Sequence, residues 1–201
     1  MRKIILWGFI LTSIGTLAAA VLPVPDIFTF QFRQEGGRYI FNGNFQVDTD
    51  SRLAWDVLTD YDHVSRFVAN LNSRVLSREG DQVMVDQTVG GGFLFIRQEV
   101  RGLLKIQEKP YESICLEEIS RKQFGFYQGQ WTLSLVSPGS GMRVAYELEA
   151  ERNLATPSFV TAGLFRQAAE DLVIGMKNEM DRRETVKRMN SLKVEAKKSG
   201  S

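Results

Sequence analysis

The stretch AWDVLTDYDHVSRFVANL (residues 54–71) carries the most regular apolar pattern of the 201-residue chain. Its large apolar side chains recur at the spacing of a helix, so they form one stripe. Because such a stripe normally packs on a core, we expect two short helices here, with Asp48 or Asp50 as N-cap of the first and Asp60 as a candidate N-cap of the second. The stripe does not tell whether a packed interior or a cavity lies beneath it. Its members are Trp55, Leu58, Tyr61, Val64, Phe67, Val68 and Leu71.

The segments on either side of this stretch have the alternating pattern of strands. RYIFNGNFQVD (residues 38–48) predicts a first strand, and after residue 71 the apolar period changes from 3.6 to 2. Turn residues such as Gly80, Gly90–Gly92, Pro110 and Pro138 separate the later segments, which predicts hairpins and antiparallel pairing. The six further strands are expected near residues 72–79, 81–90, 93–107, 112–120, 124–137 and 141–152.

The C-terminal part of the chain predicts one long helix. It starts near Thr156, a suitable N-cap, with Pro157 in the first helical position. Beyond Met180 the apolar content falls, so we expect residues 184–201 to be a charged, solvated tail that frays. The resulting order of elements, β-α-α-β6-α, predicts an α+β fold in which a curved antiparallel sheet of about seven strands wraps around the long C-terminal helix.

The chain resembles the helix-grip (SRPBCC) superfamily, which includes START lipid-transfer domains, polyketide cyclases, coenzyme Q-binding proteins and the major pollen allergens. The resemblance covers residues 38–183 and rests on the element order, on WDVLTDYDHVSRFV (residues 55–68) and on GQWTLSLVSPGSGMRVAYELE (residues 129–149). It is closest to the cyclase and coenzyme Q-binding branch. The resemblance implies a helix-grip fold with a pocket for a hydrophobic ligand between the sheet and the C-terminal helix.

The first 20 residues are expected to direct export. Arg2 and Lys3 precede an apolar run that ends in Ala18–Ala20, the pattern of a signal peptide. The alternative is an uncleaved signal anchor, since the run approaches the length of a membrane span. Residues 21–37 then form a linker. Without Arg2 and Lys3 the 25 basic side chains fall to 23, against 24 acidic ones, so the charge favours no nucleic acid partner.

The inventory of reactive side chains predicts neither a catalytic set nor a metal site, and no cofactor. His63 is the only histidine and Cys115 the only cysteine. We expect His63 to be a surface residue or helix cap, and Cys115 to be a small buried hydrophobe. VGGGF (residues 89–93) lacks the residues of a phosphate loop. Its glycines predict a bulged hairpin turn, or alternatively a lid beside a ligand entrance.

Alternation along the strands sorts the two faces of the predicted sheet. Tyr127, Trp131, Leu133 and Leu135 share one face, and Met142, Val144, Tyr146 and Leu148 share the corresponding face of the next strand.

Two other predicted strands have apolar faces interrupted by a polar residue. Gln98 falls on the face of Ile96, Val100 and Leu104, and Glu118 falls on the face of Ile114 and Leu116. Either they face a wet or ligand-filled cavity, or a bulge turns them outward, and both alternatives remain open.

Small residues on the long helix leave a similar choice between close packing and room for a ligand. The candidate ligand-binding residues are Tyr61, Phe67, Val68, Ile96, Gln98, Val100, Glu118, Tyr127, Trp131, Tyr146, Leu164, Ala168 and Leu172.

Three functions fit these observations. The first is an exported carrier or binding protein for a hydrophobic small molecule such as a lipid, isoprenoid or quinone-like compound. The second is a cyclase or dehydratase that uses the same pocket, with Tyr127, Tyr146 or Glu118 moving a proton. The third is a domain with a filled core whose charged tail meets a protein partner or a membrane surface.

Overall fold

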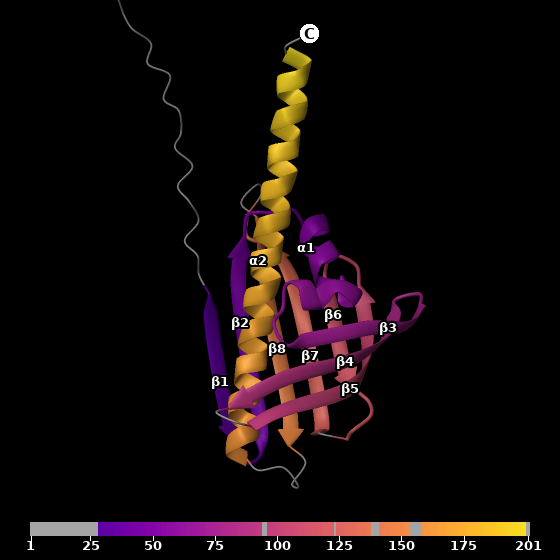
Figure 1. The fold of residues 1–201 in the computed structure, drawn as a ribbon, viewed down its shortest axis with the longest axis vertical. Helices are drawn as coiled ribbons and strands as arrows, with labels where there is room; N and C mark the ends of the chain where they lie inside the picture. Colours follow the sequence, from indigo (N-terminus) through magenta and orange to yellow (C-terminus); the bar gives the residue numbers. More distant parts are fainter. Residues whose placement is uncertain (1–27, 94–95, 123, 138–140, 153–157, 200–201) are drawn as a thin grey trace, which may run out of the picture.

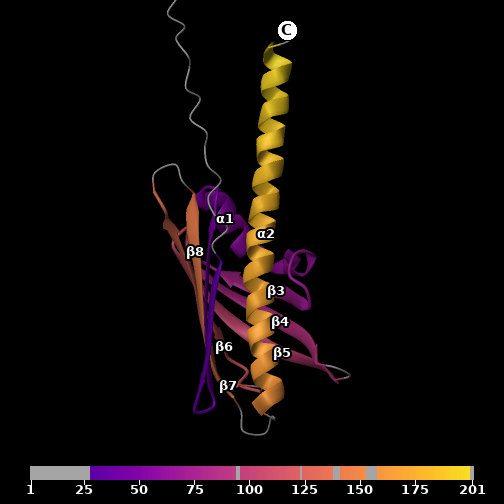
Figure 2. The same ribbon diagram turned by 90° about the vertical axis from the view of Figure 1, so that its left-hand side faces the viewer.

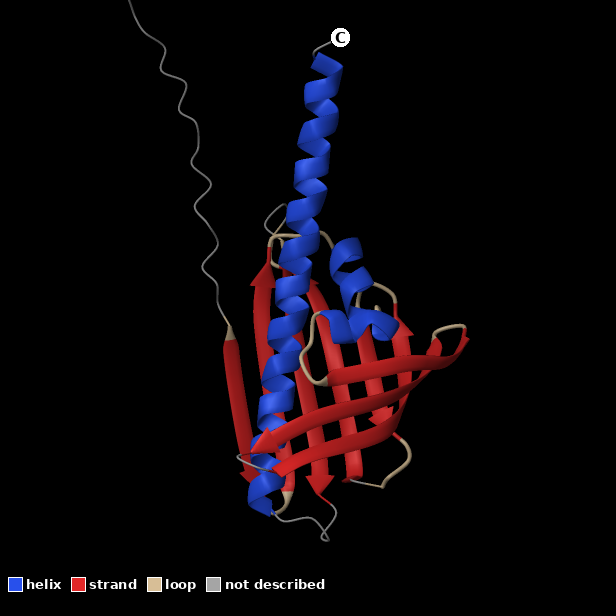
Figure 3. Ribbon diagram, viewed as in Figure 1, coloured by secondary structure: helices blue, strands red, loops and turns tan. Residues whose placement is uncertain are grey.

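The computed structural model describes residues 28–199 except residues 94–95, 123, 138–140 and 153–157, and the side chains of residues 91–98 and 152–161 also lie outside the described part. The described chain forms one eight-stranded antiparallel sheet, in the order β1-β2-β8-β7-β6-β5-β4-β3, and three helices (Figure 1; Figure 3). The strands are β1 (Thr29–Glu35), β2 (Arg38–Val47), β3 (Leu71–Glu79), β4 (Gln82–Phe93), β5 (Ile96–Lys109), β6 (Ser113–Glu118), β7 (Phe124–Leu135) and β8 (Met142–Arg152).

The helices are α1 (Ser51–Leu58), the short 3-10 helix η1 (Tyr61–Arg66) and the long C-terminal helix α2 (Ser158–Ser199). The sheet curves around the first half of α2 (Figure 2). This confirms the predicted α+β helix-grip fold with its long C-terminal helix. No helix among the described residues is long and apolar enough to span a membrane.

The eighth strand, β1, lies where a linker was predicted, so that interpretation of residues 21–37 was wrong for residues 29–35. β1 pairs with β2 through a two-residue turn at Gly36 and Gly37, which both adopt positive φ angles, of 56° and 97°. Phe28, Phe30 and Phe32 alternate along this segment and pack on the core. That period of two was the signal for a strand.

The glycine triplet does not form a turn, contrary to the prediction. Gly90, Gly91 and Gly92 belong to β4 and pair with residues of β5, and the ladder continues to Phe93 and Ile96. The three glycines therefore lie within a strand of this hairpin. Glycine also occurs inside strands, at bulges and close backbone approaches, so the triplet alone does not distinguish a turn from a strand.

Part of the apolar stripe at residues 54–71 is buried in the packed core. Asp50, and not Asp48, caps α1, because its Oδ1 accepts a hydrogen bond from the Leu53 amide at 2.8 Å. Trp55, Leu58 and Val64 are buried in the core. The part of the stripe beneath α1 and η1 therefore lies on a packed interior.

Helix α2 buries one side of its first half against the sheet, through Phe165, Ala169, Val173, Met176 and Met180. The predicted cap at Thr156 and Pro157 lies outside the described residues. The charged end is solvated as expected, since residues 185–198 are exposed, but the helix continues to Ser199 instead of fraying. Ion pairs of Lys187 and Arg188 connect the start of this exposed end to the rest of the domain.

Candidate functional site

A cavity of about 370 Å³ lies between the concave face of the sheet and the first half of α2. Its floor is formed by β5, β7 and β8, and one of its sides by the segment that follows η1. Exposed residues such as Asn70, Arg101 and Gln167 border it, so the cavity opens to solvent between them. The larger apolar lining residues are Val68, Leu71, Val89, Val100, Leu104, Phe124, Leu148, Leu164, Phe165 and Leu172.

Two hydrogen-bonded tyrosines stand in the floor of this cavity. The hydroxyls of Tyr127 on β7 and Tyr146 on β8 share a hydrogen bond. The Tyr146 ring also stacks on Trp131, with ring centroids 4.2 Å apart. Burial raises the pKa of Tyr127 to about 12 and places the pKa of Tyr146 well above its usual value. Both phenols therefore keep their protons at neutral pH.

This arrangement leaves the tyrosine pair with one hydrogen-bond donor to spare. Each phenol has one O–H group, and only one of the two protons lies in the hydrogen bond between them. Beyond this shared bond, neither hydroxyl makes a hydrogen bond to another described residue. A ligand with an oxygen acceptor could take this hydrogen bond.

Glu118 supplies a buried carboxylate at the edge of the cavity, with only 7% of its surface exposed. Its Oε1 accepts hydrogen bonds from the Ser120 hydroxyl and from the amides of Ser120, at 2.8 Å, and Leu103, at 3.2 Å. Its Oε2 accepts one from the Arg121 amide at 2.8 Å. Four donors thus satisfy the carboxylate, which is what allows it to be buried.

The charged groups that line the cavity are mostly acidic. Arg101 is the one cationic side chain among the described lining residues, and it forms a two-point ion pair with Asp86, at 2.9 and 2.6 Å. Glu99, Glu118 and Asp171 are the acids. Burial, together with the neighbouring Glu170, raises the pKa of Asp171. The lining therefore offers no uncompensated positive charge to a ligand.

The segment after η1, residues 67–70, forms the wall between α2 and β4. At Gly175 the backbone of α2 approaches so closely that a Cβ atom would lie 2.5 Å from the Phe67 carbonyl oxygen. On the other side the Gly90 amide donates to the Asn70 carbonyl at 2.7 Å. These contacts place Val68 in the cavity wall.

An ion pair holds η1 to α2. Arg183 Nη2 lies 2.5 Å from Asp60 Oδ2, and Asp60 Oδ1 lies 2.7 Å from Nδ1 of His63. Asp60 was expected as the cap of η1, but its carboxylate makes no capping hydrogen bond there. Burial opposes ionisation of Asp60, yet the hydrogen bonds from Arg183 and His63 bring its pKa below its usual value.

The structure brings most of the predicted site residues together. Eight line the cavity: Val68, Val100, Glu118, Tyr127, Tyr146, Leu164, Ala168 and Leu172. Glu118 faces inward, which decides between the two alternatives for that residue. The side chains of Ile96 and Gln98 lie outside the described part.

Three predicted residues do not line the cavity. The Tyr61 hydroxyl donates to Oε1 of the buried Glu108 at 2.9 Å. Trp131 stacks on the ring of Tyr146, its partner on the neighbouring strand. Phe67 borders a separate hollow with His63 and Arg183, whose other walls are mainly ion-paired charges. Each of the three residues lies on the expected stripe or face, but contacts with residues far along the chain keep its side chain out of the cavity lining.

Other lining residues were missed by the sequence analysis. Phe124, Leu148 and Phe165 line the cavity together with Gln87 on β4. Alternation in β8 already placed Leu148 inward, and helical spacing placed Phe165 beside Leu164. Leu135 was expected inward but is 71% exposed, because it is the last residue of β7 and lies at the end of the sheet.

The two single reactive residues lie outside the cavity. His63 is exposed and bonded to Asp60, as a surface residue. Cys115 was expected to be buried, but it is exposed, because it alternates with the inward residues Ile114 and Leu116 on β6. Within the described ranges no group of three or more His, Cys, Asp and Glu side chains could hold a metal ion.

An open antiparallel sheet curved around one long C-terminal helix, with a cavity between them, defines the helix-grip class of ligand-pocket folds. The chain belongs to the polyketide cyclase/dehydrase and lipid transport family, whose sequence model matches residues 47–177. This confirms the superfamily resemblance. No curated protein sequence matches the chain.

Solved structures share the fold at low sequence identity. A STAR-related lipid transfer protein fragment from Xanthomonas axonopodis is 13% identical, with a TM-score of 0.58 over 76% of this chain and 98% of that one. An aromatase/cyclase from Streptomyces sp. R1128 is 10% identical, with a TM-score of 0.58 over 73% and 93%. Human STARD10 is 10% identical, with a TM-score of 0.57 over 81% and 76%. At these identities the likeness establishes the fold alone.

Proposed function

We propose that this protein binds and carries an uncharged hydrophobic small molecule in the cavity between the sheet and α2. The observation that carries the proposal is the cavity itself, about 370 Å³ of space walled by apolar side chains with two tyrosines in its floor. Pockets for small organic molecules have volumes of roughly 300 to 1,000 Å³ and this mixture of apolar walls and few polar groups. A lipid, an isoprenoid or a quinone-like compound fits this description.

The charges of the lining support an uncharged ligand. A fatty acid or another anionic lipid would place its charge beside Glu118 and Asp171, while the one cation among the described lining residues, Arg101, is already paired with Asp86. Burying an unpaired charge costs several kcal/mol. A carbonyl, ester or quinone oxygen instead matches the spare O–H donor of the Tyr127–Tyr146 pair.

The same geometry argues against the cyclase alternative. A general base needs a free lone pair near the substrate and a pKa close to the working pH. Glu118 is occupied by four hydrogen-bond donors, and Tyr127 has its pKa raised to about 12. These groups are suited to holding a ligand and poorly suited to removing its protons.

Export is part of the proposal. The apolar segment at residues 1–20 has the pattern of a signal peptide, with a signal anchor as the alternative. An uncharged hydrophobic ligand needs shelter from water once it leaves a membrane. A carrier that acts outside the cytoplasm, such as in a periplasm, would supply that shelter.

Ligand extraction combined with a cavity-filling variant tests the function. Native mass spectrometry of the purified protein should show a copurifying apolar molecule, and a neutral long-chain quinone should bind more tightly than a fatty acid of matched length. Ala168→Trp fills the cavity from α2 and should abolish quinone binding. Ile174→Trp is the control, because Ile174 is 38% exposed on the same helix and does not line the cavity. Binding that survives in Ala168→Trp would refute this site.

A further inference from the structure

The last turns of α2 project from the domain as an exposed helix, which we call the helical extension (residues 185–199). Arg188, at its base, bonds Asp48 Oδ2 at 2.8 Å and Glu184 Oε1 at 2.8 Å. Eleven residues follow Arg188, so the extension reaches about 16 Å beyond this ion pair. Figure 1 shows it standing clear of the sheet.

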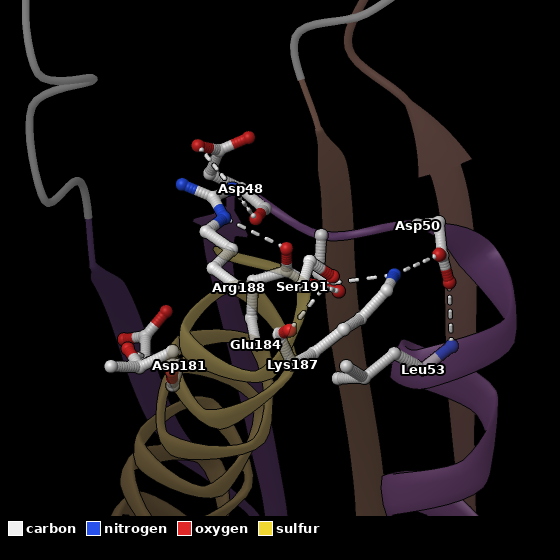
Figure 4. Close-up of polar contacts among 10 residues, drawn as sticks. Asp48, Asp50, Leu53, Asp181, Glu184, Lys187, Arg188 and Ser191 are labelled. Carbon is white, nitrogen blue, oxygen red and sulfur yellow. Dashed lines mark hydrogen bonds and ion pairs between the residues drawn. The ribbon is translucent and has the colours of Figure 1, made fainter. Parts of the chain in front are cut away.

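Ion pairs fix the direction of the helical extension. Lys187 Nζ lies 2.7 Å from Asp50 Oδ2, and Asp50 is also the N-cap of α1. Together with the Arg188 pair, this contact ties two sides of the helix to the segment between β2 and α1 (Figure 4). Exposed ion pairs contribute little stability one by one, but the helix is already anchored by its buried first half. The extension is therefore held in one orientation relative to the domain.

The helical extension presents an apolar stripe to solvent. Val186, Met189, Leu192 and Ala196 fall within about 120° of the helix circumference. Met189 is 49% exposed and Leu192 is 65% exposed. Such a stripe has an unfavourable contact with water unless another surface covers it.

Positive charge accompanies this stripe and indicates what covers it. Lys193 lies within the same arc of about 120°, between Met189 and Val186, and Lys197 lies about 20° beyond its edge. Lys198 follows Lys197 in the chain, and none of the three lysines forms an ion pair among the described residues. The extension's acid, Glu195, lies outside the stripe's arc, about 60° from Leu192. A second copy of the helix would bring these lysines together, whereas an anionic lipid surface complements them.

The start of the described chain lies at the same end of the domain. Thr29 pairs with Asn44 near the end of β2, four residues before the Asp48 that holds Arg188. The chain before β1 therefore joins the domain on the side from which the helical extension projects. The apolar residues of the expected signal peptide or anchor precede this point in sequence.

We infer that the helical extension is a docking site for an anionic phospholipid surface. Its apolar stripe enters the interface between headgroups and acyl chains, and Lys193 and Lys197 contact lipid phosphates. This contact is distinct from the ligand cavity, which lies beside the other end of α2. It would hold the carrier at the membrane surface.

A local probe on the full chain tests the docking site independently of the N-terminal segment. In a Cys115→Ser background, Ala196→Cys places an environment-sensitive fluorophore on the stripe, and Ser191→Cys places it on the opposite face. Vesicles of phosphatidylcholine with phosphatidylglycerol should shift the emission of the probe at 196 to shorter wavelength and leave the probe at 191 unchanged. Vesicles of phosphatidylcholine alone should produce a much smaller shift.

Charge variants decide whether the lysines are responsible. K193E/K197E should weaken the partitioning of the probe at 196 at least about 25-fold, because each lysine near an anionic surface contributes roughly fivefold. K105E/K122E makes the same charge change at exposed positions elsewhere and should leave partitioning unaltered. An equal loss in both variants would overturn the proposal. The proposal would also be overturned by a blue shift of the probe at 196 that needs no vesicles and grows with protein concentration. That result would show that a second copy of the protein covers the stripe.

Discussion

Gly102 on β5 faces the side chain of Glu118 so closely that a Cβ atom on Gly102 would lie 2.9 Å from the Glu118 Cγ atom. The carboxylate cannot retreat, because four donors hold its two oxygens. The missing side chain at Gly102 is therefore what allows a charged group to be buried at the edge of the cavity.

Gly102→Ala should consequently lower the free energy of unfolding by about 1 to 3 kcal/mol, the usual cost of forcing atoms into a packed site. Gly125→Ala is the matched control on β7, where no atom lies within 4 Å of the added Cβ. Urea denaturation of both variants measures the difference. Equal stabilities would show that Glu118 yields freely, against the hydrogen bonds described.

A second pair of glycines tests the wall formed by residues 67–70. Gly175→Ala directs a methyl group at the Phe67 carbonyl, and should cost about 1 to 3 kcal/mol while displacing Val68 from the cavity. Gly163→Ala, on the same helix, meets no atom within 4 Å and should stabilise the protein by up to about 1 kcal/mol. Thermal unfolding should thus move in opposite directions in the two variants. A stabilised Gly175→Ala protein would contradict the close approach.

Replacing the buried carboxylate itself should also destabilise the protein. In Glu118→Gln one oxygen becomes an NH₂ group, which cannot accept a hydrogen bond from the Arg121 amide or from the donors at Oε1. The expected loss is about 1 to 3 kcal/mol in the free energy of unfolding. Glu117→Gln, at the neighbouring position on the opposite face of β6, should change stability by less than about 0.5 kcal/mol.

The tyrosine pair predicts a loss of stability at alkaline pH. The unfolded chain deprotonates tyrosine near pH 10, whereas burial raises the pKa of Tyr127 in the folded protein to about 12. Between these values the unfolded state binds fewer protons, so stability is fully present below about pH 10 and falls as the pH rises towards 12. Urea denaturation across this range measures the slope.

Phenylalanine variants identify the source of that alkaline slope. Tyr127→Phe and Tyr146→Phe should each flatten it, because each removes a phenol with a raised pKa. Tyr61 also has its pKa raised by burial and by Glu108, so part of the slope should remain. An unchanged slope in the double variant would place the effect elsewhere in the protein.

Much of the architecture could be predicted from local patterns. The six strands from β3 to β8 and the helix pair lie close to their expected ranges, because alternation and helical spacing report which face of an element is buried. The same patterns identified eight residues of the cavity lining. β1 was missed although Phe28, Phe30 and Phe32 alternate, since Pro23 and Pro25 just before them suggested a loop.

Residues that were assigned to the correct face could still have the wrong role. Trp131 faces inward as expected, but it stacks on its cross-strand partner Tyr146 and does not line the cavity. Tyr61 lies on the stripe and bonds Glu108, a residue 47 positions away in the chain. Partners of this kind depend on the curvature of the sheet, which is a property of all its strands together.

The sequence by itself determined the order of elements, the inward faces of the strands and the amphipathic first half of α2, because these depend on spacing within a few residues. Only the tertiary structure decided that Val68 and Leu71 border empty space while Trp55 and Val64 are buried in packed core. It also decided that Glu118 is buried opposite Gly102 and that α2 continues as a helix to Ser199. These features depend on packing and hydrogen bonds between segments far apart in the chain, and no local period encodes them.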